Sequence, residues 1–306
     1  MYQVFSHPLG PVPYELANAD GTIRKNNKSS LGREIMKTIP FVTSIPNPSV
    51  YIIDGMALVH RLPPNLSTFG DAALALLRMA IRDSGESIRV DVVFDVYRQL
   101  SIKAGERVRR KTQTSLQFSN IQSGHKVQQW NKFLSSSENK VQFLRFIASE
   151  WEEEVYRQRL MSKTLFLTSD IVCKKLTTAD VVDIGQLQCT HEEADTRILL
   201  HVQHAVSSGF HNIVVCADDT DVLVLLVAHM STFNADIYMR SGTSTKVKIV
   251  HVNKIATRLG QSVCLGLPGL HAFTGCDSVS AFAGKGKVSP LKLMRIAQRC
   301  EPPRSF

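Results

Sequence analysis

The sequence lacks several features that would assign a protein to a class at once. Its 6 cysteines are scattered, and no two form a Cys-x-x-Cys pair. A disulfide framework or a structural zinc site is therefore not expected, and a reducing compartment fits better. No apolar run approaches the roughly 20 residues that cross a bilayer. The first residues also lack the basic-then-apolar order of a signal peptide. We therefore expect an intracellular protein with no membrane partner.

The charge balance favours an anionic partner. The chain has 306 residues, long enough for one large domain or two smaller ones, and a formal net charge of +9. Excess Lys and Arg attract polyanions such as nucleic acid, although many basic proteins bind nothing anionic. Basic residues are concentrated in residues 97–150, which we interpret as an arch-like insertion.

Apolar runs that alternate with helical patterns predict an α/β fold with a mainly parallel central sheet flanked by helices. The predicted strands are 50–53, 89–94, 164–168, 171–176, 212–216, 235–239 and 246–252. The predicted helices are 71–82, 139–161, 192–206, 220–228, 253–259 and 262–274. Residues 1–46 are rich in Pro, Gly, Asn and Ser and predict an irregular lead-in.

Acidic residues follow three of the predicted strands. Asp54, Asp95 and Asp219 each stand just past an apolar run. In a parallel sheet the carboxyl ends of the strands meet at one edge, where ligands bind. Each Asp alone is also explained by a turn or a helix cap. Several carboxylates at one point repel each other unless a cation lies among them, so the pattern favours a Mg²⁺ or Mn²⁺ site.

Further acids stand at predicted helix starts. Glu192, Glu193 and Asp195 open one helix, where the helix dipole favours negative charge. Glu192 and Asp195 share a helical face, and spacing leaves open which glutamate faces a metal. Asp221 falls inside an apolar helix start, where an unpaired charge is disfavoured, so we favour a metal ligand there.

The segment after residue 274 combines an acid with a glycine turn. Asp277 precedes a predicted short helix, a turn at residues 284–286, and a final helix with Ser289 as its N-cap. Backbone N–H groups in tight glycine turns can hold a phosphate, although packing explains the pattern too.

Aromatic and histidine residues leave alternatives open. Phe118 and Trp130 could stack on single-stranded bases or anchor a core. His201 and His204 are interpreted as packing or surface residues, because no further ligands have zinc-site spacing.

Five short motifs follow one another along residues 48–299. They are Val-Phe-Asp (93–95) followed by Lys-Ala-Gly-Glu-Arg-Val-Arg-Arg (103–110), Glu-Ala-Asp (193–195), Asp-Thr-Asp-Val-Leu (219–223), Gly-Cys-Asp (275–277) and Gly-Lys-Gly (284–286). Together they resemble the flap endonuclease (XPG-type) family, metal-dependent 5′-nucleases with a PIN-like catalytic domain. Asp195 stands where the family has a second Glu.

The resemblance implies a PIN-like nuclease domain at residues 47–274 and a helix-two-turn-helix-like (helix-hairpin-helix) segment at residues 275–306, which we expect to be part of a larger unit. Two Mg²⁺ or Mn²⁺ ions would be held, directly or through water, by Asp54, Asp95, Glu193, Asp195, Asp219, Asp221 and Asp277. Lys103 and Arg110 would act on the scissile phosphate. Nucleic acid would be contacted by Arg98, Arg107, Arg109, Gly284, Lys285, Gly286 and Lys287.

The resulting hypothesis is a nuclease that hydrolyses phosphodiester bonds in flap or other branched DNA by a two-metal mechanism. A PIN-like endoribonuclease and a catalytically inactive nucleic-acid-binding protein of the same fold remain alternatives. A small-molecule phosphatase has less need of the extended basic surface. The basic residues 107–111 suit a nuclear-import patch as well as a gateway helix, so the nucleus is favoured over the cytoplasm.

Overall fold

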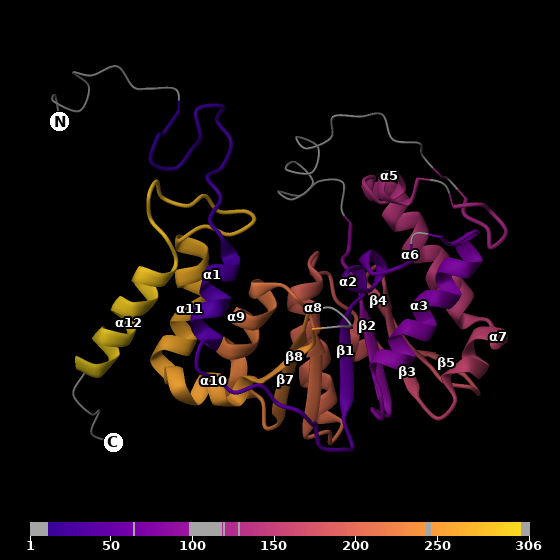
Figure 1. Cartoon of the computed structure of the whole chain (residues 1–306). Helices are drawn as coiled ribbons and strands as arrows, with labels where there is room; N and C mark the ends of the chain where they lie inside the picture. Colours follow the sequence, from indigo (N-terminus) through magenta and orange to yellow (C-terminus); the bar gives the residue numbers. More distant parts are fainter. Residues whose placement is uncertain are drawn as a thin grey trace.

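The computed structural model (Figure 1) describes residues 12–63, 65–97, 118, 120–127, 129–242 and 246–300. Its centre is an 8-stranded sheet with the order β5-β4-β3-β2-β1-β6-β7-β8. The strands are β1 (Val50–Asp54), β2 (Arg89–Val93), β3 (Thr164–Ser169), β4 (Val172–Leu176), β5 (Val181–Asp183), β6 (Asn212–Cys216), β7 (Asp236–Ser241) and β8 (Lys248–His251). Strands β3, β2, β1, β6 and β7 are parallel, and β4, β5 and β8 are antiparallel. The predicted α/β class with a mainly parallel sheet is confirmed.

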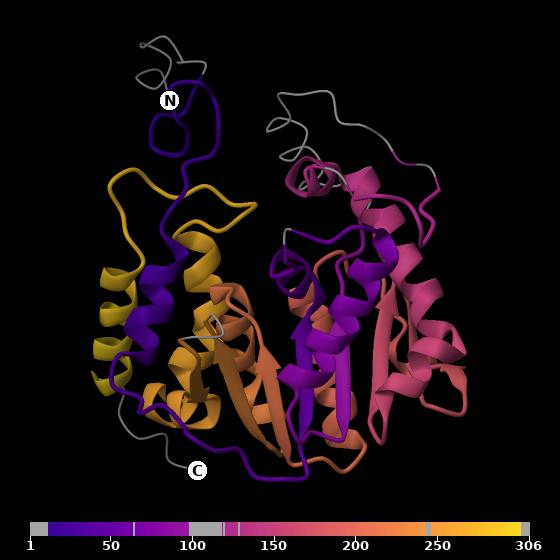
Figure 2. The same ribbon diagram turned by 45° about the vertical axis from the view of Figure 1, so that its right-hand side comes forward.

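Helices cover both faces of the sheet (Figures 1 and 2). They are α1 (Lys28–Met36), α2 (Gly55–His60), α3 (Phe69–Asp83), α5 (Trp130–Leu134), α6 (Ser137–Glu152), α7 (Glu154–Arg157), α8 (Ala194–Ser207), α9 (Thr220–His229), α10 (Val252–Leu259), α11 (Gln261–Phe273) and α12 (Val288–Cys300). Alternate residues of β1 enter two cores: Val50 and Ile52 pack with α1, α8 and α9, and Tyr51 and Ile53 pack with α3 and α6. Burial on both faces explains why these strands are continuous apolar runs.

The strand order reverses between β1 and β6. From β1 the chain proceeds to β2 and β3 on one side, and then returns to β6 and β7 on the other. The carboxyl ends of β1 and β6 therefore flank a topological switch point, the place where α/β sheets bind their ligands. Among the helices of the described ranges, none combines the length and apolar character needed to cross a bilayer.

The expectation of an irregular lead-in is wrong for Lys28–Met36, which form α1. Leu31 and Ile35 are buried against α9, so the helix is stabilised by tertiary packing rather than by its own propensity. Gly32 permits a close approach, because a Cβ at this position would lie 3.2 Å from Thr220 Oγ1. The N-terminal segment is thus part of the folded body.

The predicted single helix over residues 139–161 is also wrong. The chain leaves helical geometry at Glu153 (φ −65°, ψ 143°) and restarts as α7 and then a 3-10 turn, Gln158–Leu160. Glu150 and Glu152 stand at the end of α6, where the helix dipole disfavours negative charge. The break moves Glu154 into the first turn of a new helix, where the dipole favours an acid.

The segment after α11 differs from its prediction. Residues 275–287 contain no helix, and α12 already begins at Val288, so Ser289 lies inside the helix instead of capping it. The N-terminal segment lies beside this loop (Figure 1): Ala281 N–H donates to Arg24 O, and Ala283 N–H donates to Glu15 O, both at 2.8 Å. Backbone bonds to residues 15–24 thus take the place of local helical bonds.

Candidate metal centre

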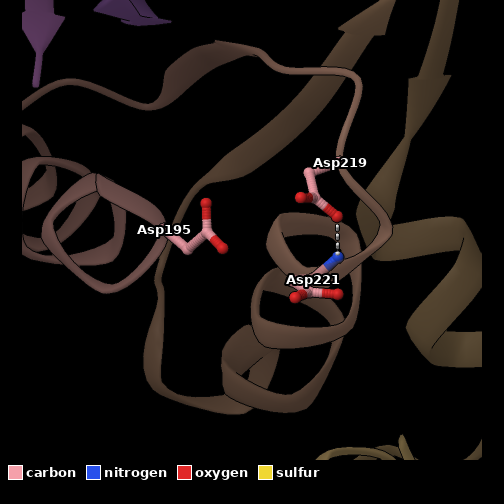
Figure 3. A group of neighbouring side chains, drawn as sticks. All are labelled: Asp195, Asp219 and Asp221. Atoms are coloured by element: carbon pink, nitrogen blue, oxygen red, sulfur yellow. Dashed lines mark hydrogen bonds between the residues drawn. The ribbon is translucent and has the colours of Figure 1, made fainter. Parts of the chain in front are cut away.

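Three carboxylates from two helix starts meet at the carboxyl edge of the sheet. Asp195 projects from the first turn of α8 toward Asp219 and Asp221 at the start of α9 (Figure 3). Each can offer an oxygen such that the three oxygens lie within 4.8 Å of one another. Oxygen ligands at this spacing fit a hard divalent cation such as Mg²⁺ or Mn²⁺. The sequence-predicted acids of these two islands are therefore brought together.

Asp54 and Asp95 are held in this edge by backbone N–H groups. Asp54 Oδ1 accepts from Met56 N at 2.9 Å and from Ala57 N at 3.1 Å, capping α2. Asp95 Oδ1 accepts from Ala194 N at 2.7 Å, at the start of α8. Burial, together with the charges on Asp95 and Asp219, raises the pKa of Asp54 to about 6 despite these N–H donors. Such a carboxylate lacks a compensating cation.

Asp221 has the opposite environment. Its Oδ2 accepts from Lys28 Nζ at 2.7 Å, and its Oδ1 lies 2.8 Å from His271 Nε2. Burial alone would raise the pKa of Asp221, but the hydrogen bonds from His271 and Lys28 outweigh burial and lower it to about 2. Burial and the charge of Asp221 raise the pKa of the neighbouring Asp219. A metal is therefore not the only group that can balance Asp221.

Asp277 and Glu193 are not among the three carboxylates whose oxygens converge. Asp277 Oδ2 lies 2.8 Å from Lys28 Nζ, and its side chain is 47% exposed. Glu193 is the N-cap residue of α8, one residue before the helix that carries Asp195. Asp277 is thus linked to Asp221 through a shared lysine.

The predicted basic residues divide into three groups. Arg98, Lys103, Arg107, Arg109 and Arg110 lie outside the described residues. Gly284, Lys285 and Gly286 are exposed. Lys287 is only 1% exposed, and its Nζ donates to His271 O, Thr274 Oγ1 and Gly275 O. The Lys287 ammonium is therefore not exposed to a nucleic acid: it caps the carboxyl end of α11.

Sequence reasoning missed three residues that support the site. Lys28 lies in a segment expected to be irregular, and nothing in its surroundings along the chain indicates its role. His271 is preceded and followed in the sequence by apolar residues, Gly and Pro, and these give no sign of a polar role. Arg197 is buried, and its Nη1 donates to Phe94 O at 2.8 Å, next to Asp95. In the sequence, only the position of Arg197, two residues after Asp195, indicates that it belongs near the site.

Of the histidines and aromatic residues with open interpretations, His201 is buried, and His204, Phe118 and Trp130 are partly buried. His201 Nδ1 lies 2.7 Å from Asp91 Oδ2, and Arg89 pairs with both Asp91 and His204, which forms a charge network between β2 and α8. Phe118 and Trp130 lie with their ring centroids 5.4 Å from that of Phe133 in an aromatic cluster. These residues hold helices together.

The carboxylates lie at an open edge and do not line the cavity among the C-terminal helices. That cavity, of about 410 Å³, lies between α9, α10 and α11 and is lined by residues such as Ala256 and Cys264. Asp219 keeps 41% of its side-chain surface exposed. An open acidic edge can accept an extended substrate that a closed pocket would exclude.

Comparisons with known proteins add no assignment. A scan against protein-family models and a search of the curated proteins found no match for this chain.

Proposed function

We propose that this protein is a divalent-metal-dependent nuclease that hydrolyses phosphodiester bonds, with a PIN-like catalytic domain and the nucleus as its site of action. The observation that carries the proposal is the convergence of carboxylates from separate parts of the sequence at the switch point of a parallel sheet. Three of these carboxylates offer oxygens within 4.8 Å of one another. A purely structural role would need fewer acids, because each buried charge costs free energy.

The residues of the site fit a hard cation. Asp195, Asp219 and Asp221, whose oxygens converge, would hold it. Asp54 and Asp95 stand at or just past the ends of the adjacent strands β1 and β2. When bound, the ion supplies Lewis acidity and lowers the pKa of a coordinated water. The chain itself orients these ligands: Asp95 is fixed by Ala194 N, and Asp219 Oδ1 accepts from Asp221 N at 3.0 Å (Figure 3).

A nucleic-acid substrate is supported by charge and shape. The chain has a net charge of +9. A polar cavity of about 270 Å³ between the N-terminal segment and residues 281–286 is lined by Arg24, Lys25 and Lys285. Cationic side chains beside exposed glycine N–H groups suit a backbone phosphate. DNA is proposed ahead of RNA because the motifs resemble those of flap endonucleases.

A non-catalytic nucleic-acid-binding protein is the second candidate, and one observation favours it. Asp221 is already balanced by Lys28 and His271 without any metal. In that case the acidic edge would be a structural ion-pair cluster.

The test is cleavage of labelled 5′-flap, single-stranded and duplex DNA, and of matched RNA, in Mg²⁺ or Mn²⁺. Asp219→Asn should lose about 100-fold or more of the rate, because it removes a metal ligand. Asp183→Asn is the matched control, since Asp183 is exposed at the end of the edge strand β5. Binding without cleavage by the folded wild type would select the second candidate, and the preferred substrate would decide between DNA and RNA.

A further inference from the structure

Two segments that are far apart in the sequence, residues 18–26 and 281–286, form a basic cavity. Both segments stand above α1 and α11 in Figures 1 and 2. The cavity has a volume of about 270 Å³, and its walls include Arg24 and Lys25 from one segment and Lys285 from the other. Of the described residues that line it, three are cationic and none is acidic. A hollow of this composition attracts an anion.

Two exposed aromatic rings lie near this cavity. Phe282 lines the cavity, and its ring centroid is 5.1 Å from that of Phe273, the last residue of α11. Phe273 is 67% exposed. Tyr14 is 71% exposed, and its carbonyl oxygen accepts from Arg24 Nε at 2.9 Å. Exposed rings beside cations are the combination that binds unpaired nucleobases together with their phosphates.

The cavity lies next to the proposed metal centre. Asn26 lines it, and the Asn26 side-chain amide donates to Thr274 O at 3.0 Å and to Lys285 O at 2.9 Å. Two residues further along the chain, which is at most about 7 Å of extended backbone, Lys28 begins α1. Lys28 Nζ lies 2.7 Å from Asp221 Oδ2. A nucleic acid that fills the cavity is therefore within reach of the carboxylates.

The arrangement favours an unpaired strand over a duplex. In a duplex the base faces are stacked on one another, so a protein surface of this kind contacts only the phosphates and the exposed rings gain nothing. The second lysine of the run Gly-Lys-Gly-Lys, Lys287, is buried and bonded to three oxygens, so it contributes no cation to a phosphate. An unpaired strand uses both the rings and the three cations of the cavity.

We propose that this surface binds the unpaired part of a nucleic-acid substrate, with a base stacked on Phe273 and a neighbouring phosphate in the basic cavity. The inference rests on the nucleic-acid partner of the proposed function, and it names the class of substrate that is delivered to the metal centre. A base face and a phosphate are common to DNA and RNA, and separate arms of the test distinguish the two.

The test is fluorescence anisotropy of the full chain with labelled single-stranded DNA, single-stranded RNA and blunt duplex DNA, in chelator so that no metal-dependent cleavage occurs. The wild type should bind a single strand about 10-fold more tightly than the duplex at the same salt concentration. Phe273→Leu should remove most of that difference and leave duplex affinity unchanged, because leucine keeps an apolar side chain and lacks the ring.

Two further variants separate charge from stacking. Lys25→Gln should weaken the binding of all three nucleic acids, because phosphates are common to them. Leu265→Ala is the matched control: it removes a 60% exposed apolar side chain of the same helix, α11, and should change none of the affinities.

Equal affinity of the wild type for single strands and duplex would overturn this inference and leave the proposed metal-dependent function standing. A Phe273→Leu variant that keeps the full preference would also overturn it. Binding of no nucleic acid, with self-association that Phe273→Leu abolishes, would overturn it and assign the exposed rings to a second copy of this chain. Because the assay contains no divalent ion, a failure of metal-dependent cleavage would leave this inference standing.

Discussion

Asp54 and Asp221 both stand at the start of a helix after a parallel strand, yet their protonation differs. The pKa of Asp54 is raised to about 6, and that of Asp221 is lowered to about 2. The difference comes from their partners, since Asp54 meets backbone N–H groups and other acids, whereas Asp221 meets Lys28 and His271. A residue's position in the local motif therefore does not determine its charge state; the neighbours from other segments do.

At the residue scale, we expect Asp54→Asn to stabilise the protein in chelator at pH 7.5. A folded-state pKa above the unfolded value means that the folded state binds the proton more tightly, so stability falls as pH rises from about 4 to about 6. The rise from 3.8 to about 6 corresponds to roughly 3 kcal/mol at most, and to roughly 1–3 kcal/mol after solvent screening. Asn keeps the capping acceptor for α2.

The measurement is urea unfolding of both proteins between pH 4 and pH 8. The advantage of Asp54→Asn should disappear toward pH 4. Asp183→Asn should show no such pH-dependent difference, because Asp183 is exposed. A destabilised Asp54→Asn variant at pH 7.5 would contradict the assignment of Asp54 as a partly buried carboxylate without a compensating cation.

At the element scale, the loop between α11 and α12 contains two lysines, Lys285 and Lys287, that differ in burial. Lys285 is exposed, and Lys287 is buried with three oxygen acceptors. Lys287→Met should cost about 2–4 kcal/mol of unfolding free energy, because it leaves buried acceptors unpaired. Lys285→Met should leave stability unchanged and weaken duplex DNA binding, lowering its salt slope by about 0.9.

Chemical denaturation and fluorescence anisotropy at several salt concentrations separate these effects. An unchanged unfolding free energy for Lys287→Met would show that its ammonium is not a cap of α11. Equal DNA affinity for Lys285→Met and the wild type would remove this loop from the nucleic-acid interface.

The elements that sequence predicts well are the buried central strands. The predicted 50–53, 164–168 and 212–216 agree with β1, β3 and β6 within one residue at either end. Continuous apolar runs that are buried on both faces explain this success. The failures, α1, the break at Glu153 and the loop 275–287, depend on packing or bonds to distant segments.

At the scale of the whole molecule, a bound metal ion would link the ends of β1, β2 and β6 with α8. We therefore expect Mn²⁺ at about 100 times its Kd to raise the unfolding free energy by about 2.7 kcal/mol relative to chelator. Asp195→Asn should abolish most of this increase, and Asp183→Asn should retain it. Thermal unfolding with and without Mn²⁺ is the measurement, and an equal shift in both variants would place the bound ion elsewhere.

The sequence by itself determined the α/β class and the edge at which Asp54, Asp95 and Asp219 gather. The spacing of apolar residues, the length of the apolar runs and the acids that follow those runs are enough for this prediction, because parallel strands place their carboxyl ends together. Only the tertiary structure decided what balances those acids. Lys28 reaches Asp221 from 193 residues away along the chain, and Lys287 is buried under a loop that the N-terminal segment holds. Such pairings arise from the packing of α1 and from burial, and no local pattern encodes them.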